Sequence, residues 1–310
     1  MSGRRAGGLD DSLCTLIVLY KNVPGRWLVV AANRDEYRDR PSEEPAVRIG
    51  RKIPWLAPMD VRAGGTWLGL SQEGVFAALT NLRDPNPDPS RQSRGQVVTN
   101  SLQMKSAAEA MDGLMAIEPG THNPFNAFVA DREGAYLVTY RDEPKLHSLK
   151  EGVHVVGNLE PCEPCEQGEG GVAQSKVDRV RDRAQRVAQL RAPEVLDALA
   201  DLCRAHSPDN SPLDSPLDDV CVHLGDSYGT RSSILIELSE LPLASKSATD
   251  KKPIGGSENR ESYASNKVGQ SERGRLLYAA GPPCAAPFED FSFLLDELRQ
   301  APDYISAEHA

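Results

Sequence analysis

The sequence predicts an α+β fold, a four-layer αββα sandwich in which two antiparallel β-sheets lie between layers of helices. Short runs rich in Val, Ile, Leu, Phe and Tyr recur along the chain and are bounded by Gly, Pro, Asn and Asp, as strands usually are. Hairpin-type links such as Ser71–Gly74 and Asp131–Gly134 join several runs, which favours antiparallel pairing over alternating βαβ units. Strands come first and last, and two helical stretches lie between them.

Nine strands and three helical segments are predicted. The strands cover Cys14–Tyr20, Trp27–Ala32, Thr66–Leu70, Val75–Thr80, Asn126–Ala130, Ala135–Tyr140, Val153–Val156, Asp219–Leu224 and Ser233–Leu238. One helical stretch covers Thr99–Ile117, and a longer one runs from about Ser175 to His206 with an interruption at Ala192-Pro193. A short amphipathic helix is expected at Phe288–Leu298.

Composition indicates one large domain with tails. A chain of 310 residues with 39% hydrophobic content can bury a sizeable core. We expect an N-terminal extension at 1–13 and the αββα domain at 14–240. Residues 241–275 are rich in Ser, Lys, Gly, Asn and Glu without periodicity, which predicts a disordered linker. A C-terminal segment, 276–310, carries the short helix.

Charge and hydropathy exclude several classes of partner. The net charge of −10 argues against binding to nucleic acid or to anionic lipid, because either needs a basic face. No apolar run approaches the roughly 20 residues that span a bilayer, so no integral membrane segment is expected. The first thirteen residues lack the apolar stretch of a signal peptide, so we expect a cytoplasmic protein. The oligomeric state is left open.

The six cysteines include one close pair, Cys162 and Cys165. A zinc site would need a second pair or histidines at ligand spacing nearby, and a redox motif would need the pair to open a helix after a strand. The pair lies instead among Pro, Glu and Gly, which favours a surface loop. We therefore expect no metal and no cofactor.

One cysteine, Cys14, precedes two strand-like runs, and the second run breaks into the polar quartet Asn33-Arg34-Asp35-Glu36. Asn and Asp often close strands through side-chain bonds to the backbone, so a structural explanation exists. A neighbouring hairpin strand can also return its end beside the first residue of the other. In that case the quartet would lie next to Cys14.

Four segments carry a resemblance to a known family. The stretches AANRDEYRDRP, AGGTWLGLSQEGVFAALTNLRDP, GNLEP and YGTRSSILIE resemble the NRDE family, also called the transport and Golgi organisation family. That family is in turn similar to the N-terminal-nucleophile cysteine hydrolases. The resemblance covers about Cys14 to Glu237, and its first half is the more specific.

The resemblance implies a catalytic set of four residues. Cys14 falls at the nucleophile of the cysteine hydrolases, and Asp35 falls at their acidic partner. Asn81 and Asn158 are similar to two asparagines that serve as oxyanion donors in the bile-salt and penicillin V acylases. In such enzymes the α-amine of a terminal cysteine, which titrates at about 8, acts as the base. The implied reaction is hydrolysis of an amide or thioester bond in a small acylated substrate.

Three further residues are candidates for substrate binding. Arg231 resembles the family's late Thr-Arg motif and could hold a carboxylate or phosphate with two hydrogen bonds. The acylases carry an arginine three residues before the acidic residue, where this chain has Ala32, and Arg34 could take its place. Trp67 is expected in the core or in a pocket wall.

Alternatives to catalysis stay open for these residues. Cys14 could be an ordinary buried strand cysteine, Arg34 and Asp35 could form a capping ion pair, and the two asparagines could be turn residues. Family members usually begin Met-Cys, whereas thirteen residues precede Cys14 here. Either those residues are removed, or translation starts at Leu13, or the chain is not a hydrolase of this type. The family also implies a different class of function, that of a non-enzymatic carrier or trafficking protein for haem or an acyl lipid.

Overall fold

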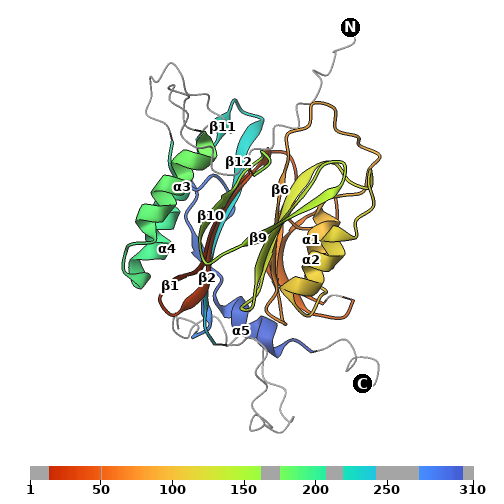
Figure 1. Cartoon of the computed structure of the whole chain (residues 1–310). Coiled ribbons are helices and arrows are strands. Elements are labelled where there is room, and N and C mark those ends of the chain that lie inside the picture. Colours follow the sequence, from red (N-terminus) through yellow and green to blue (C-terminus); the bar gives the residue numbers. More distant parts are fainter. Residues whose placement is uncertain (1–13, 50, 162–174, 207–218, 242–271, 303–310) are drawn as a thin grey trace, which may run out of the picture.

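The computed structural model describes residues 14–49, 51–161, 175–206, 219–241 and 272–302 (Figure 1). The expected extension 1–13, most of the expected linker and the Cys162–Cys165 pair lie outside these residues. Within the described ranges the chain forms two seven-stranded sheets packed face to face, and every strand pairing named below is antiparallel. The predicted fold class is confirmed.

The first sheet holds Cys14 at the start of one of its inner strands. Its strands, in spatial order, are β10 (Gly152–Val156), β1 (Thr15–Val23), β2 (Arg26–Tyr37), β12 (Tyr228–Ser239), β13 (Gly274–Ala279) and β14 (Glu289–Asp290), with β11 (His223–Leu224) paired to β12.

The second sheet is a meander in chain order. Its strands are β3 (Ser42–Arg48), β4 (Trp55–Asp60), β5 (Leu68–Ser71), β6 (Phe76–Asn81), β7 (Phe125–Ala130), β8 (Ala135–Tyr140) and β9 (Pro144–Leu149).

Helices cover the outer face of each sheet. Helices α3 (Lys176–Val187) and α4 (Ala192–Cys203) pack on the first sheet, and α1 (Gly95–Ser101) and α2 (Ala107–Met115) pack on the second. A fifth helix, α5 (Phe293–Gln300), adds three leucines to the core between the sheets. The layers therefore run helix, sheet, sheet, helix, as predicted.

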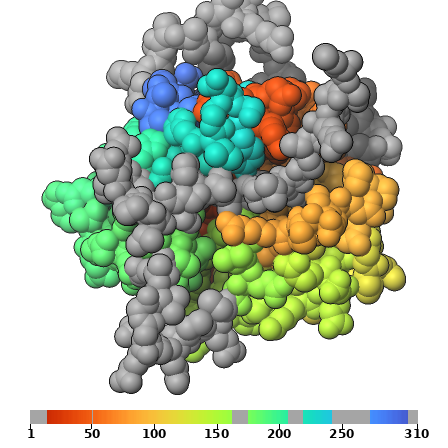
Figure 2. Space-filling view, turned by 90° about the horizontal axis from the view of Figure 1, so that it is seen from above, coloured from red at the N-terminus to blue at the C-terminus, as the bar shows by residue number. Residues whose placement is uncertain are grey.

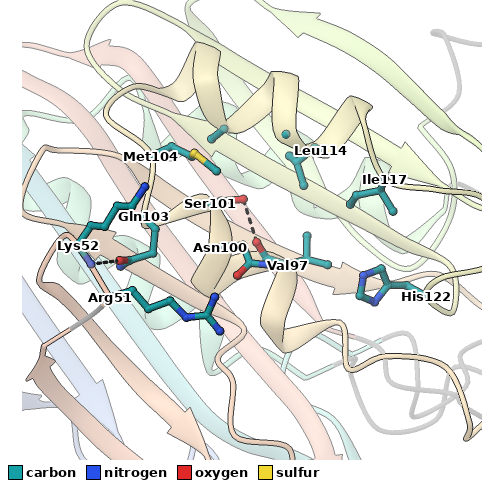
Figure 3. Close-up of a pocket in the computed structure, with 12 residues that line it drawn as sticks. Arg51, Lys52, Val97, Asn100, Ser101, Gln103, Met104, Leu114, Ile117 and His122 are labelled. Atoms are coloured by element: carbon teal, nitrogen blue, oxygen red, sulfur yellow. Dashed lines mark hydrogen bonds between the residues drawn. The ribbon is translucent and has the colours of Figure 1, made fainter.

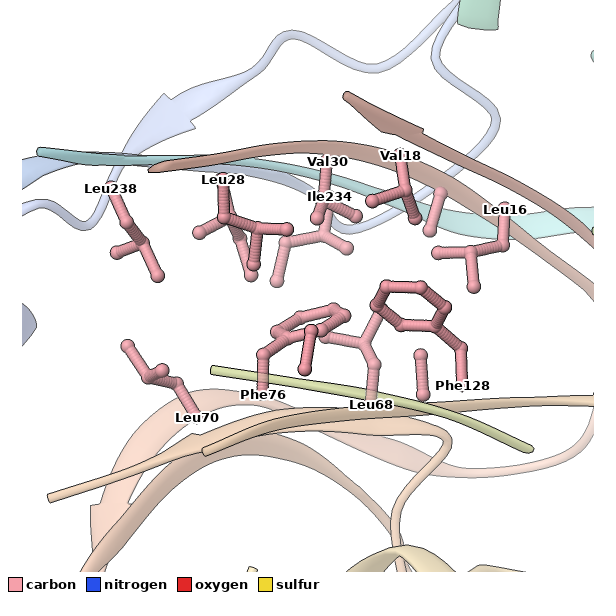
Figure 4. Close-up of a cluster of buried hydrophobic side chains, with 14 of the residues drawn as sticks. Leu16, Val18, Leu28, Val30, Leu68, Leu70, Phe76, Phe128, Ile234 and Leu238 are labelled. Atoms are coloured by element: carbon pink, nitrogen blue, oxygen red, sulfur yellow. The ribbon is translucent and has the colours of Figure 1, made fainter. Parts of the chain in front are cut away.

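The core between the sheets is built from alternate residues of facing strands. Figure 4 shows aliphatic side chains of β1, β2 and β12 pointing toward Leu68, Leu70, Phe76 and Phe128 of the second sheet. On β2 the even-numbered Leu28 and Val30 face this core, whereas the odd-numbered Val29 and Ala31 face α3 and α4, as strand alternation requires.

Several element boundaries differ from the predictions. The first predicted helix, 99–117, is two helices, because the Ser106 side chain accepts a hydrogen bond from the Glu109 amide and caps a new start. Strands β3 and β9 were not predicted, since both are edge strands whose apolar residues are interrupted by Pro and by charged or polar side chains. Strands β4 and β13 were not predicted either, and the predicted strand at 219–224 is reduced to two residues. The two-residue strand β14 lies inside the predicted helix 288–298, which begins only at Phe293.

Candidate active site

The polar quartet does not end a strand, as its sequence suggests, but lies inside one. Strand β2 continues to Tyr37 because β12 pairs with it along its whole length. Asn33, Arg34 and Asp35 are all buried, and each has a partner far along the chain. The expected hairpin return is confirmed, because Thr15 of β1 pairs with Asn33 of β2 and so brings Cys14 beside the quartet.

Asp35 is held by Thr230 of the neighbouring strand β12. The Thr230 hydroxyl donates to Oδ1 of Asp35 at 2.6 Å, and Thr230 lies directly opposite Asp35 in the pairing. The other carboxylate oxygen, Oδ2, is buried and has no hydrogen-bond partner among the described residues. Burial raises the pKa of Asp35 to about 7, although Lys176 and the Thr230 hydroxyl both act to lower it.

Cys14 lies at the start of β1 with its thiol next to the Asp35 backbone. Its Sγ is 3.9 Å from the Asp35 carbonyl oxygen, and the residue is partly exposed. The pKa of the Cys14 thiol is raised to about 12, mainly by burial and to a lesser extent by the negative charge of Asp35. The thiol is therefore protonated at neutral pH, and a base must remove its proton before it can act as a nucleophile.

The thiol opens on a small pocket between the sheets. This pocket has a volume of about 10 Å³, which is room for roughly one water molecule. Its walls come from β1, β2, β5, β6 and the residue before β5, and they include Cys14, Ala32, Trp67, Leu79 and Thr80. Trp67 is thus part of the pocket wall, as expected.

Arg34 joins this pocket to an acidic residue of the second sheet. Its guanidinium lies over the Trp67 ring, 4.4 Å from the centroid, and donates to Asp60 at 2.9 Å. The proposed capping pair of Arg34 with Asp35 is wrong, because the two adjacent side chains leave the strand on opposite faces. Nη1 of Arg34 is buried without a hydrogen-bond partner in the described part of the chain.

The two asparagines lie together at the ends of β6 and β10. The Asn158 amide donates to the backbone carbonyl of Asn81 at 2.6 Å, and Thr80, a pocket residue, donates to the Gly157 carbonyl at 2.6 Å. Asn158 is buried, whereas Asn81 is partly exposed. The structure thus places both asparagines beside the pocket wall and uses the side-chain amide of Asn158 to hold Asn81.

Arg231 bonds to the backbone just after β13. Its Nη1 donates to the Ala280 carbonyl at 3.2 Å. Burial raises the pKa of Tyr278, whereas the cations of Arg231 and Arg34 lower it, so both arginines lie near the same phenol. Arg231 does not line the pocket at Cys14.

Thr230 is not among the residues that the sequence singles out. In the motif Tyr-Gly-Thr-Arg the arginine is the evident candidate, and nothing in the local pattern marks the threonine as a partner of Asp35. A cluster that could hold a metal ion was also missed, consisting of His206, Cys221, His223 and Cys284. Only the Cys221-x-His223 spacing is visible in the sequence, because the other two residues come from distant segments.

A larger pocket lies elsewhere, between α1, α2 and neighbouring loop residues. It has a volume of about 360 Å³ and shares no lining residue with the pocket at Cys14. Figure 3 shows Arg51 and Lys52 at one end of it, with apolar Met104, Leu114 and Ile117 along its length.

Among the described residues no helix is long and apolar enough to cross a membrane.

Two solved structures resemble the chain at low identity. A Caenorhabditis elegans N-acylethanolamine-hydrolyzing acid amidase ortholog is 12% identical with a TM-score of 0.45, over 72% of this chain and 92% of that one. A penicillin V acylase from Agrobacterium tumefaciens is 14% identical with a TM-score of 0.45, over 74% and 83%.

Comparison with known sequences identifies the family. The Mus musculus Transport and Golgi organization 2 homolog is 34% identical over 139 residues, which cover 42% of this chain and 50% of the mouse protein, and the Homo sapiens homolog gives the same values. The chain thus spans about half the length of these relatives. Residues 13–241 match the profile of the family described as Transport and Golgi organisation 2. Because that profile covers most of the chain and begins one residue before Cys14, the chain belongs to the Transport and Golgi organisation 2 family.

Proposed function

We propose that the chain is a cysteine hydrolase that cleaves an amide or thioester bond in a small acylated substrate, with Cys14 as nucleophile. One observation carries this proposal: a buried carboxylate with an unpaired oxygen, that of Asp35, adjoins a pocket thiol at the start of β1. A buried carboxylate oxygen without a partner costs free energy unless a cation or donor meets it. The α-ammonium of a Cys14 that begins the chain would be such a cation.

The reaction requires a chain that begins at Cys14, either by removal of residues 1–13 or by a translation start at Leu13, since a free amine is needed as base. The α-amine takes the proton of the Cys14 thiol, and the thiolate attacks the acyl carbonyl carbon. The C–N or C–S bond of the substrate then breaks, and the α-ammonium gives its proton to the leaving group. Water attacks the acyl-enzyme, returns a proton to Cys14 and releases a carboxylic acid.

We assign to Asn81 the stabilisation of the oxyanion. Asn158 is assigned the role of holding Asn81 in place through the hydrogen bond from its side-chain amide to the Asn81 carbonyl. Asp35, itself positioned by Thr230, orients the α-ammonium. Trp67, with the Arg34 guanidinium over its ring, is assigned to the pocket wall nearest the acyl group. Arg231 is assigned an anionic group of the substrate outside this pocket. Because the pocket accommodates roughly one water molecule, a substrate must widen it on binding.

The test compares chains that differ at one end. Three proteins are purified: one that begins at Met1, one that begins at Cys14 and the latter with Cys14→Ser. Each is incubated with N-acyl amides and acyl thioesters of several chain lengths, and product release and the intact protein mass are followed. The native N-terminus is measured in parallel by intact mass of protein purified from its own host.

We expect acid release and an acyl adduct on Cys14 only in the chain that begins at Cys14, with the other two slower by roughly 10²-fold or more. Equal rates in the chain that begins at Cys14 and in its Cys14→Ser variant would contradict a cysteine nucleophile. A native mass that retains residues 1–13 would remove the base from the mechanism and also contradict the proposal.

The larger pocket favours a second candidate, a carrier of an amphipathic anion such as an acyl lipid. Its volume, about 360 Å³, lies within the usual range of small-molecule sites, and an apolar length with Arg51 and Lys52 at one end suits an acyl chain with a carboxylate. Binding of a fluorescent fatty acid is expected to weaken in Arg51→Glu/Lys52→Glu and to stay unchanged in Cys14→Ser. Binding that is unchanged in the double variant would exclude this pocket.

A further inference from the structure

We propose that His206, Cys221, His223 and Cys284 bind one Zn²⁺ ion in a tetrahedral Cys₂His₂ site. Each residue offers one ligand atom, and these four atoms lie within 4.8 Å of one another. None of the four ligands has a role in the hydrolase proposal, and the site departs from our expectation that the chain binds no metal.

The distances match those of zinc ligands. Zn–S bonds near 2.3 Å and Zn–N bonds near 2.0–2.1 Å at tetrahedral angles place neighbouring N and S ligands roughly 3.6 Å apart. Nε2 of His223 is 3.6 Å from Sγ of Cys221 and 3.2 Å from Sγ of Cys284. The rings of His206 and His223 lie 5.2 Å apart by their centroids. A zinc ion between the four atoms needs only small adjustments of side chains.

The chemistry of the surroundings also suits zinc. Two thiolates and two neutral imidazoles prefer Zn²⁺ among common divalent ions, because thiolate is too soft a ligand for Mg²⁺ or Ca²⁺. The Asp219 carboxylate lies 3.8 Å from Nδ1 of His206, which resembles the outer carboxylate that commonly orients a zinc-bound histidine.

The side chain of Arg38 must move when zinc binds to His223. Its Nη2 lies 3.2 Å from Nδ1 of His223. When zinc occupies Nε2, neutral imidazole carries its proton on Nδ1, so Arg38 can no longer donate there and its guanidinium must turn away. Zn²⁺ with two thiolates carries no net charge, so the nearby cation opposes binding little.

The four ligands join segments that are distant in the sequence. His206 lies just after α4, and Cys284 lies after β13. Cys221 lies two residues before β11, and His223 is the first residue of β11. Figure 2 shows the β11–β12 hairpin and the C-terminal segment side by side on one face of the molecule. The ion would therefore connect the C-terminal segment, through Cys284, to the end of α4, through His206.

Two hydrogen bonds connect the proposed zinc site to Asp35. The Val222 amide donates to the Thr230 hydroxyl at 2.8 Å, and that hydroxyl donates to Asp35 at 2.6 Å. Because Val222 lies between two ligands, the ion would fix the backbone that holds Thr230 and, through it, the carboxylate. Zinc is thus a structural ion that orders the candidate active site.

The test uses the full chain, purified with a tag that contains no histidine. We expect about one zinc per chain by elemental analysis, and a fall of roughly tenfold or more in Cys284→Ser and in His206→Ala, whose side chains are exposed. The matched control is Cys162→Ser/Cys165→Ser, which removes two cysteines other than the proposed ligands and should keep the metal. Cobalt added to metal-free protein should give the visible bands of a tetrahedral site with thiolate charge transfer, and these bands should vanish in Cys284→Ser.

Chelation should lower the melting temperature of the wild type and of the control but not of Cys284→Ser. Three results would overturn the proposal: no stoichiometric zinc and no tetrahedral cobalt spectrum in the wild type, metal retained in the cluster variants, or a Cys221–Cys284 disulfide. The disulfide would appear as a mass lower by two hydrogens in unreduced protein that reverts on reduction.

Discussion

At the scale of single residues, the ionisation of Asp35 is the feature with the largest consequence. Its pKa rises from 3.8 to about 7 because the carboxyl is buried. Between those two values the folded protein binds a proton that the unfolded chain has released. The contribution of Asp35 to the free energy of unfolding therefore falls as the pH rises from about 4 to about 7, by roughly 4 kcal/mol, and then stays constant.

Asp35→Asn should remove this slope, because the amide cannot ionise and keeps an acceptor for Thr230. The free energy of unfolding of the variant, relative to that of the wild type, should rise as the pH increases from about 4 to about 7, and denaturant unfolding at each pH measures it. Asp39→Asn, at an exposed position in the loop after β2, should leave the wild-type slope in place. A wild type and a variant with parallel pH profiles would show that Asp35 is ionised throughout. In a chain that begins at Cys14 the ammonium should lower the Asp35 pKa and reduce the slope.

At the scale of elements, the pairing of β13 with β12 depends on one glycine. Gly274 has φ +144°, and a Cβ there would overlap the carbonyl oxygen of Glu237 on the paired strand. Gly152 in β10 has nearly the same φ, +143°, but nothing lies within 4 Å of the place of its Cβ. Both backbone conformations strain any residue with a Cβ, and only at Gly274 does that Cβ also clash.

Gly152→Ala should lower the free energy of unfolding by roughly 1–3 kcal/mol, the usual cost of such a backbone conformation. Gly274→Ala should cost more, because the strands must also separate locally. Thermal and denaturant unfolding of the two variants measure the difference. Equal losses would mean that β13 moves aside freely and contributes little to the sheet.

At the scale of the whole molecule, the C-terminal segment belongs to the same core as the N-terminal strands. Leu295 of α5 is fully buried in the core between the sheets, whereas Phe293 of the same helix is 62% exposed. Leu295→Ala should therefore lower the free energy of unfolding by roughly 2–5 kcal/mol. Phe293→Ala should change it by about 0.5 kcal/mol or less.

Both variants should unfold in one transition, followed by circular dichroism and by tryptophan fluorescence. A separate early transition in Leu295→Ala, with the rest of the curve unchanged, would show that the segment folds independently of the two sheets.

Much of this arrangement could be predicted from the sequence. Apolar runs with turn residues between them are local signals, so most strands, the antiparallel pairing and the two helical regions follow directly. The hairpin that returns Asn33 to the start of β1 is local as well, and it accounts for the proximity of Cys14 and Asp35. The edge strands β3 and β9 could not be found this way, because Pro and charged or polar residues interrupt their apolar pattern and their pairing depends on a neighbouring strand.

Local patterns in the sequence are enough to predict the fold class, the family resemblance and the nearness of the thiol to the polar quartet. The folded chain was needed to show that the quartet lies inside a strand, that Arg34 pairs with Asp60, and that Thr230 holds Asp35 across 195 positions of sequence. It also brought together His206, Cys221, His223 and Cys284. The physical reason is that hydrogen bonds and ligand sets depend on distance in space, and strand pairing and sheet packing set those distances between residues that no local pattern connects.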